Sequence, residues 1–95
     1  MSERNFKGDL FEQFARIGKA LSSGKRLEML EFLAQGERSV EQLARMTGLS
    51  VANTSQHLKQ LRQVGLVTAR KEGLYVYYQV AGDGIVRLLA ALRAV

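Results

Sequence analysis

The run Ser-Val-Glu-Gln-Leu-Ala-Arg-Met-Thr-Gly-Leu-Ser at 39–50, continued by Val-Ala-Asn-Thr-Ser-Gln-His-Leu-Lys-Gln-Leu-Arg-Gln-Val at 51–64, decides the fold of this 95-residue chain. Its apolar residues recur at helical spacing, which predicts one helix over 40–46 and a second over 51–64. Only the turn Thr47–Ser50, which contains a glycine, separates the two helices. Two short helices joined in this way are the sequence signature of a helix-turn-helix.

Capping and turn residues extend this unit on both sides. Ser39 and Ser50 each stand directly before a helix, at the position of an N-cap. Gln42 follows Ser39 by three residues, which is the pattern of a capping box. After the second helix, the β-favouring runs 66–70 and 75–80 flank a glycine-containing turn, and this predicts a hairpin. A hairpin at this place corresponds to the wing of a winged helix-turn-helix.

Three further helices are expected outside the unit. Apolar spacing predicts helices from about Asp9 to Lys19, from Ser23 as N-cap through Gln35, and from Ile85 to about Ala94. The fold class is therefore mainly α with a β-hairpin wing, in the order α-α-α-α-β-β-α. The chain contains no evident linker or repeat, so residues 1–95 are expected to form a single winged helix-turn-helix domain.

The composition excludes several classes of function. There is no cysteine and only one histidine, so no disulfide, metal site or cofactor is expected. No nucleophile–base pair, carboxylate pair or phosphate-binding glycine loop is present, and we therefore expect no enzyme. No apolar run approaches the roughly 20 residues of a membrane helix, and no signal-peptide pattern opens the chain. A cytoplasmic protein without a membrane partner is expected.

The positive charge is concentrated in one part of the chain. The net charge is +5, and the window from Arg38 to Lys71 carries six of the 14 basic residues but only one of the nine acids, Glu41. Eight basic and eight acidic residues balance outside the window. The whole excess thus lies on the helix-turn-helix and the hairpin, as a partner with a phosphate backbone requires.

The second helix of the motif has two distinct sides. On a wheel of about 100° per residue, Thr54, Leu58, Leu61 and Gly65 share an arc that faces the core. The opposite side carries no carboxylate; it consists of Ala52, Gln56, Lys59 and Gln63, with Ser55 and Gln60 at its edges. Hydroxyl, amide and ammonium groups bind base edges and phosphates, although a merely solvated helix face has a similar composition. Next to a basic hairpin, this face predicts the reading of double-stranded DNA.

The predicted hairpin offers a second contact with DNA. Arg70 and Lys71 are expected at its tip, where they would contact phosphates beside the recognition helix; a solubilising turn is the alternative. Strand alternation places Tyr75 and Tyr77 on one face and Tyr78 on the other. We expect the tyrosines to serve mainly in strand packing.

These residues resemble the ArsR/SmtB family of bacterial winged-helix repressors, over roughly Ile17–Val80. The resemblance is strongest at Gly-Lys-Ala-Leu-Ser (18–22), Arg26-Leu27, Gly-Leu-Ser (48–50), Ser55-x-His57-Leu58-x-x-Leu61, Gly65-Leu66-Val67 and the hairpin from Arg70 to Tyr78. It implies a homodimer formed through the first and last helices. Such a dimer binds an inverted-repeat operator and represses nearby genes.

The resemblance also implies particular site residues. Carried over by position, the base-reading residues are Ala52, Asn53, Ser55 and Gln56. With the residues argued above, the expected DNA-binding set is Ser50, Ala52, Asn53, Ser55, Gln56, Lys59, Gln60, Arg70 and Lys71. The implied dimer interface, which the broad apolar coverage of the two helices also favours, is Leu10, Phe11, Phe14, Ile85, Leu88, Leu89 and Leu92.

The inducer sites of the family are not matched. Metal-sensing members carry cysteines in the third helix, where this chain has Ser39 and Glu41. Others carry ligands in the last helix, where Asp83 stands without a histidine and Ile85 takes the place of one. We therefore expect no metal, and the sequence does not identify a small-molecule effector.

Two runs, 36–40 and 49–58, are similar to a subgroup whose winged helix precedes a rhodanese-type sulfur-transfer domain. Two alternatives to a small, complete repressor therefore stay open. One is that the chain is the DNA-binding half of such a fusion. The other is a winged-helix protein-interaction module without DNA binding.

Overall fold

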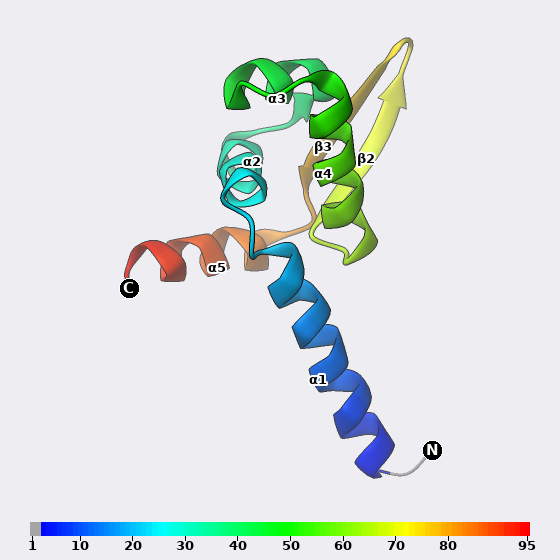
Figure 1. Ribbon diagram of the computed structural model, residues 1–95, viewed down its shortest axis with the longest axis vertical. Helices are drawn as coiled ribbons and strands as arrows, with labels where there is room; N and C mark the ends of the chain where they lie inside the picture. Colours follow the sequence, from blue (N-terminus) through cyan, green and yellow to red (C-terminus); the bar gives the residue numbers. More distant parts are fainter. Residues whose placement is uncertain (1–2) are drawn as a thin grey trace.

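The computed structural model describes residues 3–95, with side chains described from Phe6 onward, so residues 1 and 2 of the predicted domain lie outside it. Within this range the chain forms five helices and three short strands, and Figure 1 shows how they are arranged. Their bounds are α1 Glu3–Ala20, α2 Gly24–Gln35, β1 Arg38–Ser39, α3 Val40–Thr47, α4 Val51–Gln63, β2 Val67–Glu72, β3 Tyr75–Val80 and α5 Asp83–Arg93. None of these helices is long and apolar enough to cross a membrane.

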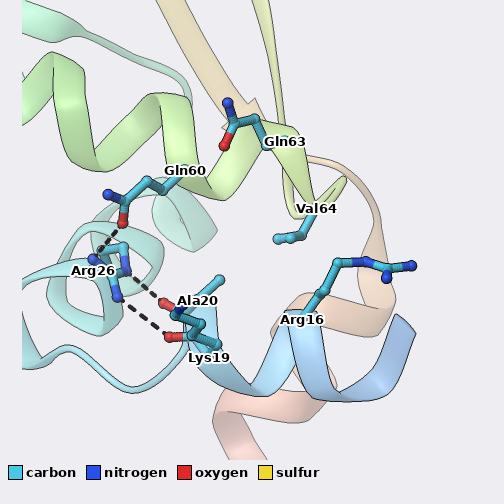
Figure 2. A pocket seen from close by; sticks show the side chains of 7 residues that line it. All are labelled: Arg16, Lys19, Ala20, Arg26, Gln60, Gln63 and Val64. Carbon is cyan, nitrogen blue, oxygen red and sulfur yellow. Dashed lines mark hydrogen bonds between the residues drawn. The ribbon is translucent and has the colours of Figure 1, made fainter. Parts of the chain in front are cut away.

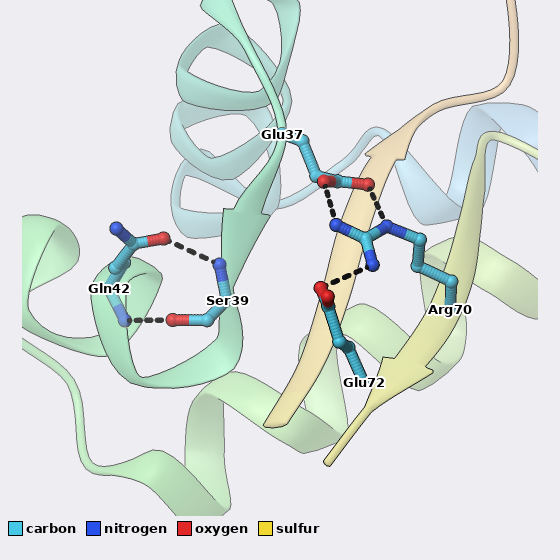
Figure 3. Close-up of polar contacts among 5 residues, drawn as sticks. All are labelled: Glu37, Ser39, Gln42, Arg70 and Glu72. Atoms are coloured by element: carbon cyan, nitrogen blue, oxygen red, sulfur yellow. Dashed lines mark hydrogen bonds and ion pairs between the residues drawn. The ribbon is translucent and has the colours of Figure 1, made fainter. Parts of the chain in front are cut away.

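The predicted helix pair is confirmed together with its caps. The Ser39 hydroxyl accepts a hydrogen bond from the Gln42 backbone N–H at 3.1 Å, and the Gln42 side chain accepts one from the Ser39 N–H at 2.7 Å (Figure 3). Ser50 caps α4 in the same way, through the backbone N–H of Asn53. Gly48 ends α3 in the left-handed conformation at φ 74°, which favours glycine. Local capping thus fixes both ends of the turn.

The sheet contains one strand more than expected and a longer hairpin. The two-residue β1 pairs with β3, giving the antiparallel order β1-β3-β2. Pairing of β2 with β3 continues to Glu72 opposite Tyr75, so Gly73 and Leu74 alone form the turn. Gly73 has φ +60°, as the first turn residue of a type II′ hairpin requires.

The expectation that Arg70 and Lys71 lie at the tip is therefore wrong. Both belong to strand β2, opposite Tyr77 and Val76 of β3. The reason is the short turn: a two-residue loop leaves Lys71 and Glu72 free to continue the ladder. The tip instead presents Leu74, whose side chain is 94% exposed.

The core lies where α2, α3 and α4 meet one face of the sheet. Its fully buried side chains include Met29, Leu30, Leu33, Leu43, Leu58, Leu61 and Val67. The predicted inner arc of α4 is confirmed for Thr54, Leu58 and Leu61, which are all buried. Tyr78 is buried as well, whereas Tyr75 on the other face of β3 is exposed. Thr54, Leu58 and Leu61 thus hold α4 against the core, and we call these buried residues the floor of α4.

Helix α1 projects from this body, and the N-terminus lies at its far end (Figure 1). It begins several residues before the predicted start at Asp9. The rings of Phe11 and Phe14 contact each other edge to face, with 5.8 Å between their centroids, and both residues are more than half exposed. Only the end of α1 reaches the core, through Ala20 and the partly buried Ile17. Most of the apolar stripe of α1 is therefore uncovered.

Candidate nucleic-acid interface

The exposed side of α4 gathers most of the predicted DNA-binding residues on one surface. Six of them lie at or after the start of the helix with exposed side chains: Ser50, Ala52, Asn53, Ser55, Gln56 and Lys59. Among the described residues, no side chain holds Gln56 or Lys59 in a hydrogen bond or ion pair. We call these six residues the reading face. The Ser50 hydroxyl accepts the capping hydrogen bond from Asn53, while the side chains of Gln56 and Lys59 can meet a ligand.

The electrostatics of α4 favour an anionic partner. The helix contains Lys59 and Arg62 and no acidic residue. Its N-terminus, next to the small side chain of Ala52, carries the positive end of the helix dipole, which attracts phosphate. Because Thr54, Leu58 and Leu61 hold the opposite side in the core, the reading face has a fixed orientation.

One predicted member already has a partner on the protein. The Gln60 side-chain oxygen accepts a hydrogen bond from Nη1 of Arg26 at 2.7 Å. The same nitrogen lies 3.3 Å from Nδ1 of the half-buried His57. The side chain of Gln60 is nevertheless exposed, so its place in the DNA-binding set stays a prediction.

Arg70, one of the two basic residues of the wing strand β2, also has partners on the protein. Nε and Nη2 of Arg70 donate to the two carboxylate oxygens of Glu37 at 2.9 and 2.7 Å, and Nη1 donates to Glu72 at 2.7 Å (Figure 3). The guanidinium also lies 4.8 Å above the ring of Tyr77. This arrangement, which we call the wing clasp, offsets the charge of Arg70 with two carboxylates.

The wing clasp shifts the pKa of Glu37 and that of Arg70. The hydrogen bonds from Arg70 lower the pKa of Glu37 below its ordinary value of 4.5. The hydrogen bonds that Glu37, and then Glu72, accept from the guanidinium raise the pKa of Arg70, which stays charged. Glu37 and Glu72 are the acids directly outside the basic window found in the sequence, so the window overstated the free positive charge of the wing. Lys71 is exposed and forms no ion pair within the described part of the chain.

The predicted dimer surface is confirmed as exposed only in part. Phe11, Phe14 and Leu92 are exposed, and Ile85 and Leu88 are half-buried. Leu10 is 39% exposed, whereas Leu89 is only 3% exposed and belongs to the core cluster. The placement of Leu89 in the interface is thus corrected, because α5 turns this residue inward against the core and leaves almost no surface for a partner.

Sequence reasoning missed the role of Arg26. This residue, near the start of α2, contacts both the end of α1 and the side chains of α4 (Figure 2). It borders a cavity of about 310 Å³ between α1 and α4. Arg26 belongs to the motifs of the resemblance, but no local pattern names partners 31 and 34 residues away. Within the described residues, no three Asp, Glu or His side chains gather as a metal site would require.

A capped helix pair, a buried floor beneath the second helix and a three-stranded sheet with a hairpin wing define a winged helix-turn-helix protein. The family model described as "Bacterial regulatory protein, arsR family" matches residues 23–69. Together with the relatives below, this match shows that the chain belongs to the ArsR family, a family of DNA-binding transcriptional regulators.

Several relatives are similar over most of this chain. The HTH-type transcriptional regulator Rv0324 of Mycobacterium tuberculosis is 47% identical over 89 residues, which cover 94% of this chain but only 39% of that protein. Rv0081 of the same organism is 39% identical over 87 residues, covering 90% of this chain and 76% of the relative. This chain therefore spans about two fifths of the length of Rv0324.

A solved structure is similar in both sequence and fold. It is the solution structure of a homodimeric winged helix-turn-helix DNA-binding domain, fragment 1–100, from Mycobacterium bovis, described as a possible ArsR-family regulator. Its sequence is 46% identical, the TM-score is 0.89, and the match covers 99% of this chain and 85% of that one. The crystal structure of Rv0081 has a TM-score of 0.83 at 37% identity, covering 90% of this chain and 86% of that one.

Proposed function

We propose that this chain is a single winged helix-turn-helix domain, residues 1–95, that represses transcription by binding an inverted-repeat operator as a homodimer. The observation that carries the proposal is the reading face. It combines free polar side chains, the absence of carboxylates on α4 and a buried floor. Its place of action is the cytoplasm, where bacterial DNA lies.

Each part of the reading face has a distinct task in this proposal. Ser55 and Gln56, with Asn53 beside them, donate to and accept from base edges in the major groove, which separates one sequence from another. Ser50, Lys59 and the wing residue Lys71 contact phosphates, which contributes affinity without sequence preference. The small Ala52 allows the helix N-terminus to approach the backbone closely.

The homodimer is supported by apolar surface that this chain does not cover itself. Phe11 and Phe14 on α1 and Leu92 on α5 are exposed, and Leu10, Ile85 and Leu88 lie on the same helices. The similar Mycobacterium bovis domain is described as homodimeric. A two-fold dimer would present two copies of α4 to successive major grooves, about 34–36 Å apart.

Footprinting tests this proposal directly. Protection of a DNA fragment from upstream of the chain's own gene against nuclease is measured with the wild type and with the Gln56→Ala variant. The mass of the complex is measured by light scattering. We expect two protected half-sites one helical turn apart and two chains per duplex. Protection of a single site by one chain would contradict the dimer, and no protection at all would favour an interaction module.

A second candidate concerns a larger protein. More than half of the similar regulator Rv0324 lies outside the match with this chain, which supports the proposal that the domain serves as the DNA-binding half of a longer protein. The runs 36–40 and 49–58 favour a rhodanese-type partner domain. Sequencing the reading frame past Val95 tests this candidate: a rhodanese-like cysteine loop supports it, and a stop codon excludes it.

A further inference from the structure

Arg26 connects three helices at one point. From α2, its Nε donates to the carbonyl oxygen of Ala20 at 2.6 Å and its Nη2 to that of Lys19 at 3.3 Å, both at the end of α1. Its Nη1 donates to the Gln60 side chain on α4 at 2.7 Å. Figure 2 shows the guanidinium between the last carbonyls of α1 and the side chain of Gln60. We call this set of contacts the Arg26 brace.

The chemistry of the brace suits an arginine and no other residue. The last carbonyls of a helix have no partner within the helix and carry its partial negative charge, so a cation stabilises them. A guanidinium offers donors in fixed, different directions and can bond to α1 and α4 at once, whereas a lysine ammonium acts as a single point charge. The 3.3 Å contact of Nη1 with His57 Nδ1 is a hydrogen bond in the tautomer whose Nδ1 accepts, because arginine only donates. Each of the three nitrogens of the Arg26 guanidinium thus donates to an acceptor on the protein.

The position of the brace gives it mechanical importance. Helix α1 leaves the body of the molecule and contacts the core only near its end, through Ile17 and Ala20. It is 18 residues long, or about 27 Å at 1.5 Å per residue. A swing of about 10° at its junction would displace its far end by about 5 Å, more than the roughly 3.4 Å of helix axis that each phosphate of one DNA strand occupies. Phe11, nine residues before Ala20, would move by about 2 Å in the same swing.

We propose that Arg26 is a positioning residue that sets the spacing between the two half-sites the dimer accepts. The inference rests on the proposed homodimer, in which α1 is the arm that joins two copies. By fixing the direction of α1 relative to α4, Arg26 fixes the separation of the two reading faces. Arg26 does not contact DNA itself in this proposal, and base preference within a half-site is unchanged by its loss.

The test uses a series of duplexes with identical half-sites whose spacer is shortened or lengthened by one and two base pairs. Affinities are measured for the wild type, Arg26→Met, Arg26→Lys and Gln60→Met. The matched control is Arg16→Met, because Arg16 borders the same cavity but, among the described residues, bonds only to Gln13 of its own helix.

We expect the wild type and Arg16→Met to prefer one spacer by about tenfold or more, as a rigid bivalent protein should. Arg26→Met should reduce this preference to about threefold or less, with Arg26→Lys and Gln60→Met in between. The preference for the correct half-site sequence should be unchanged in Arg26→Met, Arg26→Lys and Arg16→Met. An unaltered spacer preference in Arg26→Met and Gln60→Met would overturn the inference. If Arg26→Met does not fold, Gln60→Met and Arg26→Lys decide.

A measurement without DNA separates this inference from the proposed function. The chain has no cysteine, so a single spin label can be attached through Arg62→Cys on the exposed side of α4. The distance distribution between the two labels of a dimer should be narrow in the wild type and broad with Arg26→Met. Equal widths would overturn the brace even if the operator is bound. If the wild type binds no inverted repeat but its distance distribution is narrower than that of Arg26→Met, the proposed function is contradicted and the role of Arg26 is not.

Discussion

The reading face of α4 and the wing strand β2 carry similar basic residues but differ in what those residues already bind. Lys59 on α4 has no partner among the described side chains, and α4 contains no acid. Arg70 on β2 is held by Glu37 and Glu72 in the wing clasp. The two regions also differ in support, because α4 lies on buried side chains while β2 beyond Val67 is largely exposed.

This difference shows that the number of charges in a segment does not equal the charge available to a ligand. An arginine that donates to two carboxylates has its charge offset by them and has fewer of its five N–H donors left for a phosphate. Glu37 precedes Arg70 by 33 residues and meets it only because β1 brings the segment beside the sheet. We therefore propose that α4 reads DNA and that the wing makes an ordered but weaker contact with phosphate through Lys71.

The largest expected effect concerns the floor of α4. Leu58 is fully buried, so Leu58→Ala leaves a cavity and should lower the free energy of unfolding by about 2–5 kcal/mol. Denaturant unfolding measures this loss. The matched control is Leu74→Ala at the tip of the wing, which should change stability by about 0.5 kcal/mol or less. Similar losses in both variants would mean that α4 and the wing are supported equally.

The next effect concerns base reading. Gln56→Ala should reduce the free-energy difference between operator and scrambled DNA by about 1–3 kcal/mol, the scale of one good base contact. The control is Gln63→Ala on the last turn of α4, far from the helix N-terminus, which should leave the difference unchanged. Competition binding gives both values. An unaltered operator preference in Gln56→Ala would show that the reading face is misassigned.

The salt dependence of binding compares the two regions most closely. Lys59→Ala should reduce the slope of log affinity against log salt by about 1.8, because each of the two copies in the dimer loses one phosphate contact worth about 0.9. Arg70→Ala should reduce it by clearly less, because the wing clasp already compensates Arg70. Glu37→Gln should steepen the slope by releasing Arg70 in part. Equal flattening in Lys59→Ala and Arg70→Ala would show that Arg70 leaves Glu37 for phosphate when DNA binds.

The smallest effect is the response of the wing clasp to acid. Arg70 lowers the pKa of Glu37 below 4.5, so Glu37 binds a proton less readily in the folded than in the unfolded chain. The pairing thus stabilises the fold above pH 4.5 and is lost as the pH falls through the lower, folded-state pKa. NMR titration of the Glu37 carboxyl should give a midpoint below 4.5, which Arg70→Ala raises. An unchanged midpoint in Arg70→Ala would contradict the clasp.

The features that could be predicted from the sequence are those encoded locally. Ser39, Gln42 and Ser50 lie within a few residues of the groups they cap, and Leu58 and Leu61 repeat with the helix period. The β-favouring runs and the glycine-containing turn between them predicted the wing, and the family resemblance added the homodimer. Strand β1 could not be predicted, because two residues show no periodicity and pair with β3 only after the chain has folded.

The part of the site that escaped prediction depends on distant partners. Leu89 is one of several apolar residues on α5, and the helix wheel alone does not say which of them packs against the core. On a helical wheel the side chain of Gln60 has no evident partner, but its oxygen accepts a hydrogen bond from Arg26, 34 residues earlier. The same applies to Arg70 and Glu37. Sequence periodicity identified the correct side of α4, and tertiary contacts decided which of its residues stay available.

The most direct test of the central claim is DNA binding by fluorescence anisotropy. It compares the inverted repeat upstream of the chain's own gene with a scrambled duplex, at about 50 and 200 mM salt. The account predicts preference for the native repeat and an affinity that falls steeply with salt. Equal binding to both duplexes, or binding insensitive to salt, would contradict the claim that the exposed face of α4 reads DNA.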